Sequence, residues 1–185
     1  MNVLMKPFRL KPGRVFSGVF LAAAVLAGPV SAVPTQAKES QLISRYGDWE
    51  AFQEKDGGET VCYIGSAPTK SRGKYKKRGE TYVLITHRPA EKKLAVVSIK
   101  AGYTYQQESE VDVIIGPKTF KLFTDAGHAF AYDAKGDKAL VKAMVRGAKM
   151  VIKGTSSRGT PTTDTYSLKG FTAAYKAINQ ACKVK

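Results

Sequence analysis

The 185-residue sequence has few of the residues that carry chemistry, with two cysteines, two histidines and one tryptophan. It has no Cys-x-x-Cys pair, and His87 and His128 stand apart without clustered acids, so no metal motif is present. No serine lies in a Gly-x-Ser-x-Gly elbow, which marks the nucleophile of α/β-hydrolases. These absences disfavour metal, thiol and serine chemistry. We therefore predict a protein that is not an enzyme and that needs no metal or other cofactor.

Long apolar runs are also scarce. The run at residues 15–27 has 13 residues, fewer than the about 20 that a membrane-spanning helix needs. Four cations precede the run, namely Lys6, Arg9, Lys11 and Arg14, and small residues follow it at Val30-Ser31-Ala32. This pattern is typical of a signal peptide, residues 1–32, cleaved after Ala32 or, as a second choice, after Ala37. The alternative is an uncleaved anchor.

Acidic residues are half as numerous as basic ones, 15 against 30, which gives a formal charge of +15. Removing residues 1–32 takes away four cations and no acid, which leaves +11. We expect such an exported protein to lie in the periplasm or at the outer membrane and to bind an anionic envelope component or a protein partner. Its charge allows peripheral association with a membrane. No motif indicates nucleic-acid binding, and the sequence leaves the oligomeric state open.

Cys62 and Cys182 both lie beyond the predicted leader. In an oxidising compartment two cysteines indicate one disulfide. A bond closing so long a loop contributes roughly 4 to 5 kcal/mol on the chain-entropy model. A catalytic thiol or a pair of metal ligands is the alternative.

The hydrophobic pattern predicts a mainly β protein. Residues 33–44 have no periodic pattern and indicate a flexible lead-in, followed by a single domain at 45–185. About nine short strands are expected, at residues 47–52, 60–67, 80–88, 94–99, 111–115, 119–124, 129–132, 149–153 and 162–168. Apolar residues at helical spacing predict one short helix at 137–146 and a C-terminal helix at 171–182. Without βαβ alternation, the economical architecture is an antiparallel β-sandwich with appended helices.

Residues 70–78 form a strongly basic run, for which we predict a projecting loop. Its cations are Lys70, Arg72, Lys74, Lys76, Lys77 and Arg78. The loop is either a solvated charged face or a contact for phosphate or sulfate groups of an anionic partner.

Hydroxyl groups are densest after the strand at 149–153. Gly154 and Gly159 have the spacing of a phosphate-binding loop, but Thr160 and Pro161 replace the Lys and Ser/Thr that the nucleotide motif requires. The side chains here define a candidate polar or anion-binding site, namely Thr155, Ser156, Ser157, Arg158, Thr160 and Asp164. The alternative is a turn whose hydroxyls satisfy its own backbone and whose Arg158 pairs with Asp164. A periplasmic hydrolase or sugar-binding protein using this block is the alternative function.

Several blocks together resemble a known family. They include Gly47-Asp48-Trp49, Val61-Cys62-Tyr63-Ile64, Thr86-His87-Arg88-Pro89, Gly154-Thr-Ser-Ser-Arg-Gly-Thr160 and Ala181-Cys182. The mature sequence, roughly Ser44 to Cys182, is similar to the invasion-associated locus B family of alphaproteobacterial exported proteins. The resemblance implies an exported envelope protein, periplasmic or attached to the outer membrane, linked in pathogenic members with entry into host cells. It implies no catalytic residues. The leader, the mature charge of +11 and the missing catalytic constellation favour a noncatalytic binding or accessory role at the cell envelope.

Overall fold

The computed structural model describes residues 40–184, so the predicted leader 1–32 and residues 33–39 of the predicted lead-in lie outside the described residues. The strands are β1 (Gln41–Tyr46), β2 (Trp49–Asp56), β3 (Glu59–Ser66), β4 (Lys70–Gly73), β5 (Tyr82–Arg88), β6 (Lys93–Lys100), β7 (Glu110–Ile115), β8 (Lys118–Asp125), β9 (His128–Phe130), β10 (Lys149–Thr155) and β11 (Pro161–Ser167). The helices are α1 (Ala134–Arg146) and α2 (Phe171–Ala181), with a short 3-10 turn, η1 (Pro89–Glu91), after β5.

All the strands pair antiparallel in one 11-stranded sheet, in the order β1-β2-β3-β5-β6-β9-β8-β7-β10-β11-β4. The predicted class is confirmed: the protein is mainly β, with one helix before the last strands and another after them. The two additional strands, β1 and β4, lie at the two edges of the sheet. Both have mostly exposed side chains, so neither shows the alternation by which the other strands were predicted.

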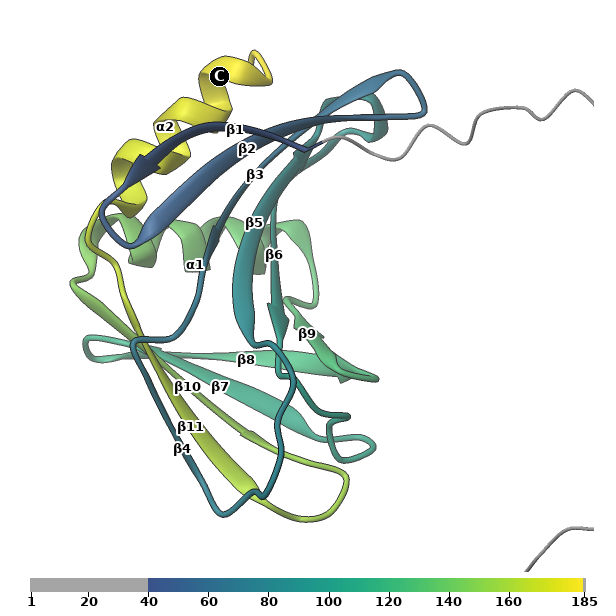
Figure 1. Ribbon diagram of the computed structural model, residues 1–185, viewed down its shortest axis with the longest axis vertical. Helices are drawn as coiled ribbons and strands as arrows, with labels where there is room; N and C mark the ends of the chain where they lie inside the picture. The colour runs from purple at the N-terminus through teal and green to yellow at the C-terminus, as the bar shows by residue number, and fades with distance from the viewer. Residues whose placement is uncertain (1–39, 185) are drawn as a thin grey trace, which may run out of the picture. The chain divides into compact units, whose positions relative to one another are not determined.

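The position of β4 makes the sheet fold over. Three residues, 67–69, join β3 to β4, and such a link spans at most about 14 Å. Yet β3 is third in the sheet order and β4 is eleventh. The far edge of the sheet therefore returns to the end of β3, and Figure 1 shows β4 beside β11, far from β1 along the sheet. This return gives the single sheet its sandwich-like form.

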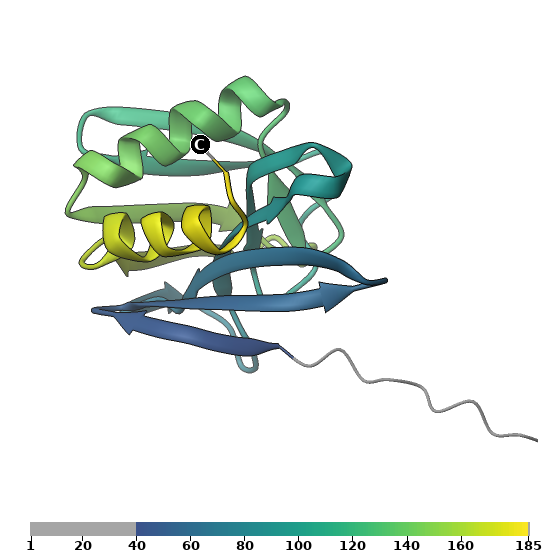
Figure 2. The same ribbon diagram turned by 90° about the horizontal axis from the view of Figure 1, so that it is seen from above.

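One face of the sheet is covered by both helices. Helix α2 packs on β1, β2 and β3, and α1 packs on β6; Figure 2 shows the two helices side by side. Trp49 on β2 meets Phe171 on α2 edge to face, with ring centroids 4.9 Å apart, and both are fully buried. Such pairs are the main stabilising contacts between helix and sheet. No helix within residues 40–184 is long and apolar enough to cross a membrane.

Helix α1 begins three residues before its predicted start at Asp137. Asp133 is its N-cap, and its side chain accepts a hydrogen bond from the N–H of Gly136 at 2.6 Å. Asp137 instead points inward and accepts from the N–H of Val97 on β6 at 2.9 Å. Burial raises the pKa of Asp137, although the bond from Val97 opposes the shift. An acidic residue that the sequence suggested as a helix start is therefore a link between α1 and the sheet.

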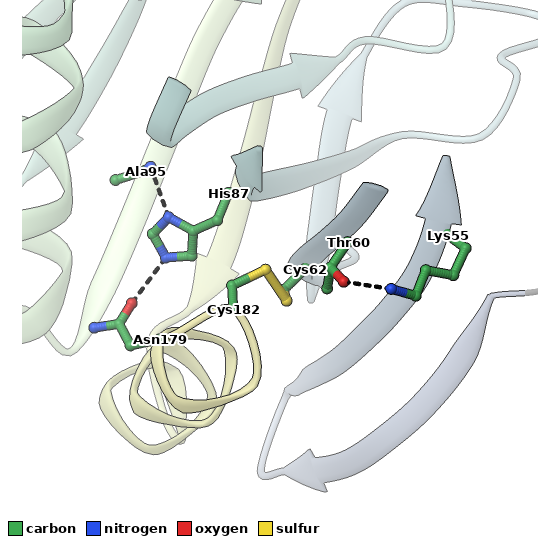
Figure 3. The surroundings of a disulfide bond; sticks show 7 residues. All are labelled: Lys55, Thr60, Cys62, His87, Ala95, Asn179 and Cys182. Atoms are coloured by element: carbon green, nitrogen blue, oxygen red, sulfur yellow. Dashed lines mark hydrogen bonds between the residues drawn. A yellow bond between two sulfur atoms is a disulfide. The ribbon is translucent and has the colours of Figure 1, made fainter. Parts of the chain in front are cut away.

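The predicted disulfide between Cys62 of β3 and Cys182 after α2 is confirmed, with Cα atoms 5.9 Å apart (Figure 3). His87 on β5 lies opposite Cys62 in the sheet and is fully buried. Its Nδ1 accepts from the N–H of Ala95 at 3.0 Å, so Nε2 carries the proton and donates to Asn179 Oδ1 at 2.8 Å. Burial lowers the pKa of His87, and the bond to Asn179 only partly opposes this. A neutral histidine thus joins α2 to the sheet beside the disulfide.

The predicted lead-in, residues 33–44, fails from Gln41 onward, because β1 begins there. This strand pairs with β2 from Gln41 opposite Gln53 to Tyr46 opposite Trp49. Backbone hydrogen bonds can hold an edge strand whose side chains stay in water. The sequence of β1 therefore has no alternation of apolar and polar residues that would have predicted a strand. The folded domain therefore starts before the predicted boundary at Arg45.

Candidate functional site

The basic run at 70–78 does not project as a free loop. Its first four residues are β4, which pairs with β11 from Lys70 opposite Thr165 to Gly73 opposite Thr162. Just before β4, the N–H and the hydroxyl of Thr69 both donate to the carbonyl of Thr165, at 2.8 and 3.0 Å. The run is thus fastened at its start to the outer edge of the sheet.

Five of the six cations of this run are exposed and make no ion pair among the described residues. On β4, Lys70 and Arg72 share the outward face because side chains alternate along a strand. Lys153 of β10 joins them, since it and Arg72 lie on either side of Thr163. We name this surface the basic edge, consisting of Lys70, Arg72, Lys74, Lys76, Lys77 and Lys153.

Sequence reasoning missed Lys153, because only the pairing of β4 with β11 brings it to the basic edge. The pairing joins segments about ninety residues apart, and no local pattern announces it. The acid opposite Lys153 on β7 is Asp112, whose Oδ1 lies 2.7 Å from Nζ of Lys121. The nearest carboxylate in register is therefore already paired with another lysine.

Arg78 is the one cation of the run that is not exposed. We predicted it as a contact for an anionic partner, and its burial corrects that prediction. Its guanidinium donates to both carboxylate oxygens of Asp164, at 2.7 and 2.6 Å, and its Nε donates to the carbonyl of Ala101 at 2.7 Å. The side chains of Arg78 and Asp164 are each only 6% exposed. Burial disfavours the charged guanidinium, but the bonds to Asp164 outweigh it and raise the pKa of Arg78 above its usual value. Arg78 therefore anchors the end of the basic run.

Tyrosines surround this buried ion pair. The guanidinium carbon of Arg78 lies 5.0 Å from the ring centre of Tyr103 and 5.5 Å from that of Tyr75, distances at which a cation is attracted to the ring face. Tyr103 also hydrogen-bonds through its hydroxyl to Thr162 Oγ1 at 2.6 Å. Burial raises the pKa of Tyr103. These contacts tie the end of the basic run to the sheet and to residue 103.

The candidate polar block forms the turn between β10 and β11, and its groups bind one another. The N–H of Ser156 donates to the carbonyl of Thr160 at 3.0 Å, and the N–H of Thr160 donates back to Ser156 Oγ at 3.2 Å. Thr155 and Ser157 are tied through their backbones to the neighbouring segment at 104–106. The Ser156 hydroxyl thus helps to close the turn, which agrees with part of the structural alternative.

Asp164 is not part of that turn. Arg158 is exposed, and the carboxylate expected to pair with it is bound by Arg78 instead. Neither Ser156 nor Ser157 hydrogen-bonds to a histidine within residues 40–184, and His87 is committed to Ala95 and Asn179. The basic edge, by contrast, presents exposed cations without ion-pair partners among residues 40–184, and such groups attract anions.

Comparison with known proteins agrees with the mainly β fold described above. The family model described as Invasion associated locus B (IalB) protein matches residues 49–179. No curated protein matches the sequence. Among solved structures, the crystal structure of invasion associated protein b from Bartonella henselae is similar, with a TM-score of 0.51 and 15% sequence identity, over 76% of this chain and 96% of that one. At this identity the likeness bears on the fold.

Proposed function

Because the chain belongs to the invasion associated locus B family, we propose that it is an exported, noncatalytic accessory protein of the cell envelope. We further propose that its basic edge binds an anionic envelope polymer. The observation that carries this proposal is the row of unpaired cations held in place by the buried pair of Arg78 and Asp164.

The geometry favours a polymer over a single small anion. Alternate residues of a strand are roughly 7 Å apart, so Lys70 and Arg72 present two charges at about that spacing on one face of β4. The cations of the basic edge are all exposed. A chain with repeated negative groups can engage several of these cations at once, and each exposed contact adds up to about 1 kcal/mol.

The test is a binding measurement with lipopolysaccharide, peptidoglycan fragments and a sulfated glycan, using the protein with its disulfide formed. Binding should weaken steeply as salt rises from about 0.05 M to about 0.5 M, because exposed charges are screened. The triple variant Lys74→Gln, Lys76→Gln, Lys77→Gln should bind about tenfold more weakly. Arg78 is left unchanged because it holds the fold.

The matched control neutralises three exposed lysines on the helices, Lys135, Lys138 and Lys176. It removes the same charge from another part of the surface, so its binding should stay close to that of the unchanged protein. Equal loss in both variants, or binding that does not respond to salt, would show that the basic edge is not the binding surface.

A further inference from the structure

A groove of about 400 Å³ lies between the C-terminal half of α1 and the hairpin of β7 and β8. It is distinct from the basic edge: in register, Ile115 of β7 lies beside Met150, at the opposite end of β10 from Gly154 and Thr155. The segment 74–77 leaves β4 after Gly73, which lies opposite Thr162 near that other end. The groove therefore lies near the Met150 end of β10, whereas the basic edge follows β4, two strands further along the sheet, and continues into residues 74–77.

Small residues open this groove. Ala139 and Ala143 lie one helical turn apart on α1 and face the half-buried ring of Phe120 on β8 across the groove. At the end of the helix, a Cβ on Gly147 would meet Ile115 Cγ2 at 2.6 Å and Leu168 Cδ1 at 2.8 Å. The absence of a side chain at Gly147 lets the helix end approach the sheet closely. The result is an apolar floor that is closed at the helix end.

The rim of the groove is uniformly positive. Lys118 from the start of β8 and Lys142 and Arg146 from α1 line it, all three are exposed, and the lining residues include no acid. None of the three makes an ion pair within the described part of the chain. Lys138, Lys142 and Arg146 follow at intervals of four on one face of α1, where like charges repel. An anion bound at the rim would relieve this repulsion.

We propose that this groove binds a single anionic phospholipid. The phosphate lies among Lys118, Lys142 and Arg146, and an acyl chain lies along Phe120, Ala139 and Ala143. Charge complementarity argues for the phosphate, because cations from β8 and α1 line the same groove and no carboxylate lines it. The apolar floor argues for an amphiphile, because free phosphate would leave it in contact with water. This site does not depend on the proposed function of the basic edge, since no residue is shared.

The test is a calorimetric titration of the full chain, with its disulfide formed. The ligand is dihexanoyl phosphatidylglycerol, kept below the concentration at which it forms micelles. The expected result is saturable binding with one lipid per chain. Dihexanoyl phosphatidylcholine, with the same acyl chains and no net charge, should bind at least about fivefold more weakly. Glycerol phosphate, the head group alone, should also bind more weakly. Equal binding of glycerol phosphate would overturn the lipid assignment in favour of a phosphate site.

Two variants separate occupancy of the groove from general charge attraction. Ala139→Trp fills the groove, keeps all three cations and changes an exposed position, so it should fold and lose binding. Lys118→Gln with Lys142→Gln and Arg146→Gln should weaken binding about a hundredfold, at about fivefold per cation. Thermal unfolding of each variant checks that it remains folded. Unchanged binding by folded Ala139→Trp would overturn the proposal.

The matched control is the basic-edge variant Lys74→Gln, Lys76→Gln, Lys77→Gln, which loses the same charge elsewhere. It should bind the monomeric lipid like the unchanged protein. If this variant loses lipid binding as fully as the groove variant, attraction is general and the groove is not the site. Because the basic-edge variant is measured with both the polymer and the monomeric lipid, failure of the groove and failure of the basic edge give different results.

Discussion

At the scale of single residues, Arg78 shows how one side chain can reverse the meaning of a sequence pattern. It ends a run in which the other five cations are exposed, yet it is buried and paired with Asp164. A buried ion pair contributes little net stability compared with apolar residues, but losing one partner leaves the other charge without compensation. Its structural importance therefore appears when the pair is broken.

We predict that Asp164→Leu lowers the free energy of unfolding by about 3 to 5 kcal/mol, because it leaves the Arg78 guanidinium buried and unpaired. Arg78→Met should also lower the free energy of unfolding, because it leaves the Asp164 carboxylate buried and unpaired. The double variant should be destabilised by less than the sum of the two single variants. Urea unfolding of the four proteins measures this cycle. Strictly additive effects would mean that the two side chains do not stabilise one another.

His87 gives a pH dependence. Its pKa is lowered in the folded protein by burial, whereas in the unfolded chain it is about 6.5. Between these two values the unfolded state binds more protons, so the free energy of unfolding rises with pH. The stability contributed by neutral His87 is fully present above about pH 6.5 and is lost as the pH falls below that value. Asp137 acts in the opposite direction. Because its pKa is raised in the folded protein, its contribution to the free energy of unfolding falls as the pH rises above about 4.

We therefore predict that the protein loses stability to urea between about pH 7.5 and about pH 5. His87→Gln keeps a side-chain donor for Asn179 but cannot titrate, so its loss over the same range should be smaller. Comparing the two proteins cancels the titration of Asp137, which both retain. The same pH slope in both would exclude His87 as the source.

At the scale of elements, the fold depends on close approaches between segments that are distant in the sequence. The turn between β1 and β2 meets the start of α2, where the N–H of Asp48 donates to the carbonyl of Lys169 at 3.1 Å. Gly170, the N-cap of α2, has φ of 90°, and a Cβ there would lie 1.8 Å from the carbonyl oxygen of Tyr46. No other residue fits this junction without displacing backbone.

We predict that Gly170→Ala lowers the free energy of unfolding by about 3 kcal/mol or more, because strain in φ adds to the collision with Tyr46. Gly57→Ala is the matched control. Gly57 also has positive φ, at 60°, but a Cβ there meets nothing within 4 Å, so we expect a cost of about 1 to 2 kcal/mol. Equal costs in thermal or urea unfolding would show that the contact with Tyr46 is not decisive.

Elements with an apolar period could be predicted from the sequence, and those without one could not. In β7, Val111, Val113 and Ile115 are buried at alternate positions, and the predicted strand at 111–115 lies within the observed one. In contrast, β1 and β4 are held mainly by backbone pairing at the sheet edges. Their side chains stay largely in water, so no burial pattern distinguishes them from loops.

The candidate site divides in the same way. Exposure of Lys74, Lys76 and Lys77 follows from their charge and was predicted. The burial of Arg78 depends on Asp164, which lies 86 residues later in the chain. The groove at α1 likewise depends on packing between a helix and a hairpin. The exposure of a charged side chain can be predicted from its own residue type. The ion pair of Arg78 and the groove at α1 depend on contacts between distant segments, which only the tertiary fold shows.

At the scale of the whole molecule, one antiparallel sheet with two helices presents two positively charged surfaces, the basic edge and the groove at α1. The groove lies beside β7 at its Ile115 end, and the basic edge follows β4 at the outer edge of the sheet. If both proposals hold, one molecule binds two anionic components at separate places on the same sheet.

The place of β4 also governs when the molecule can finish folding. This strand occupies residues 70–73, but its partner β11 begins only at Pro161. As the chain emerges from its N-terminal side, β4 stays unpaired and Arg78 has no counter-ion until β11 appears, while Cys62 must wait still longer for Cys182. Completion of the sheet edge and of the buried charge pair is thereby postponed until β11 has emerged, and the covalent cross-link until Cys182 has emerged. A half-emerged chain therefore has none of these three links between its early and late segments.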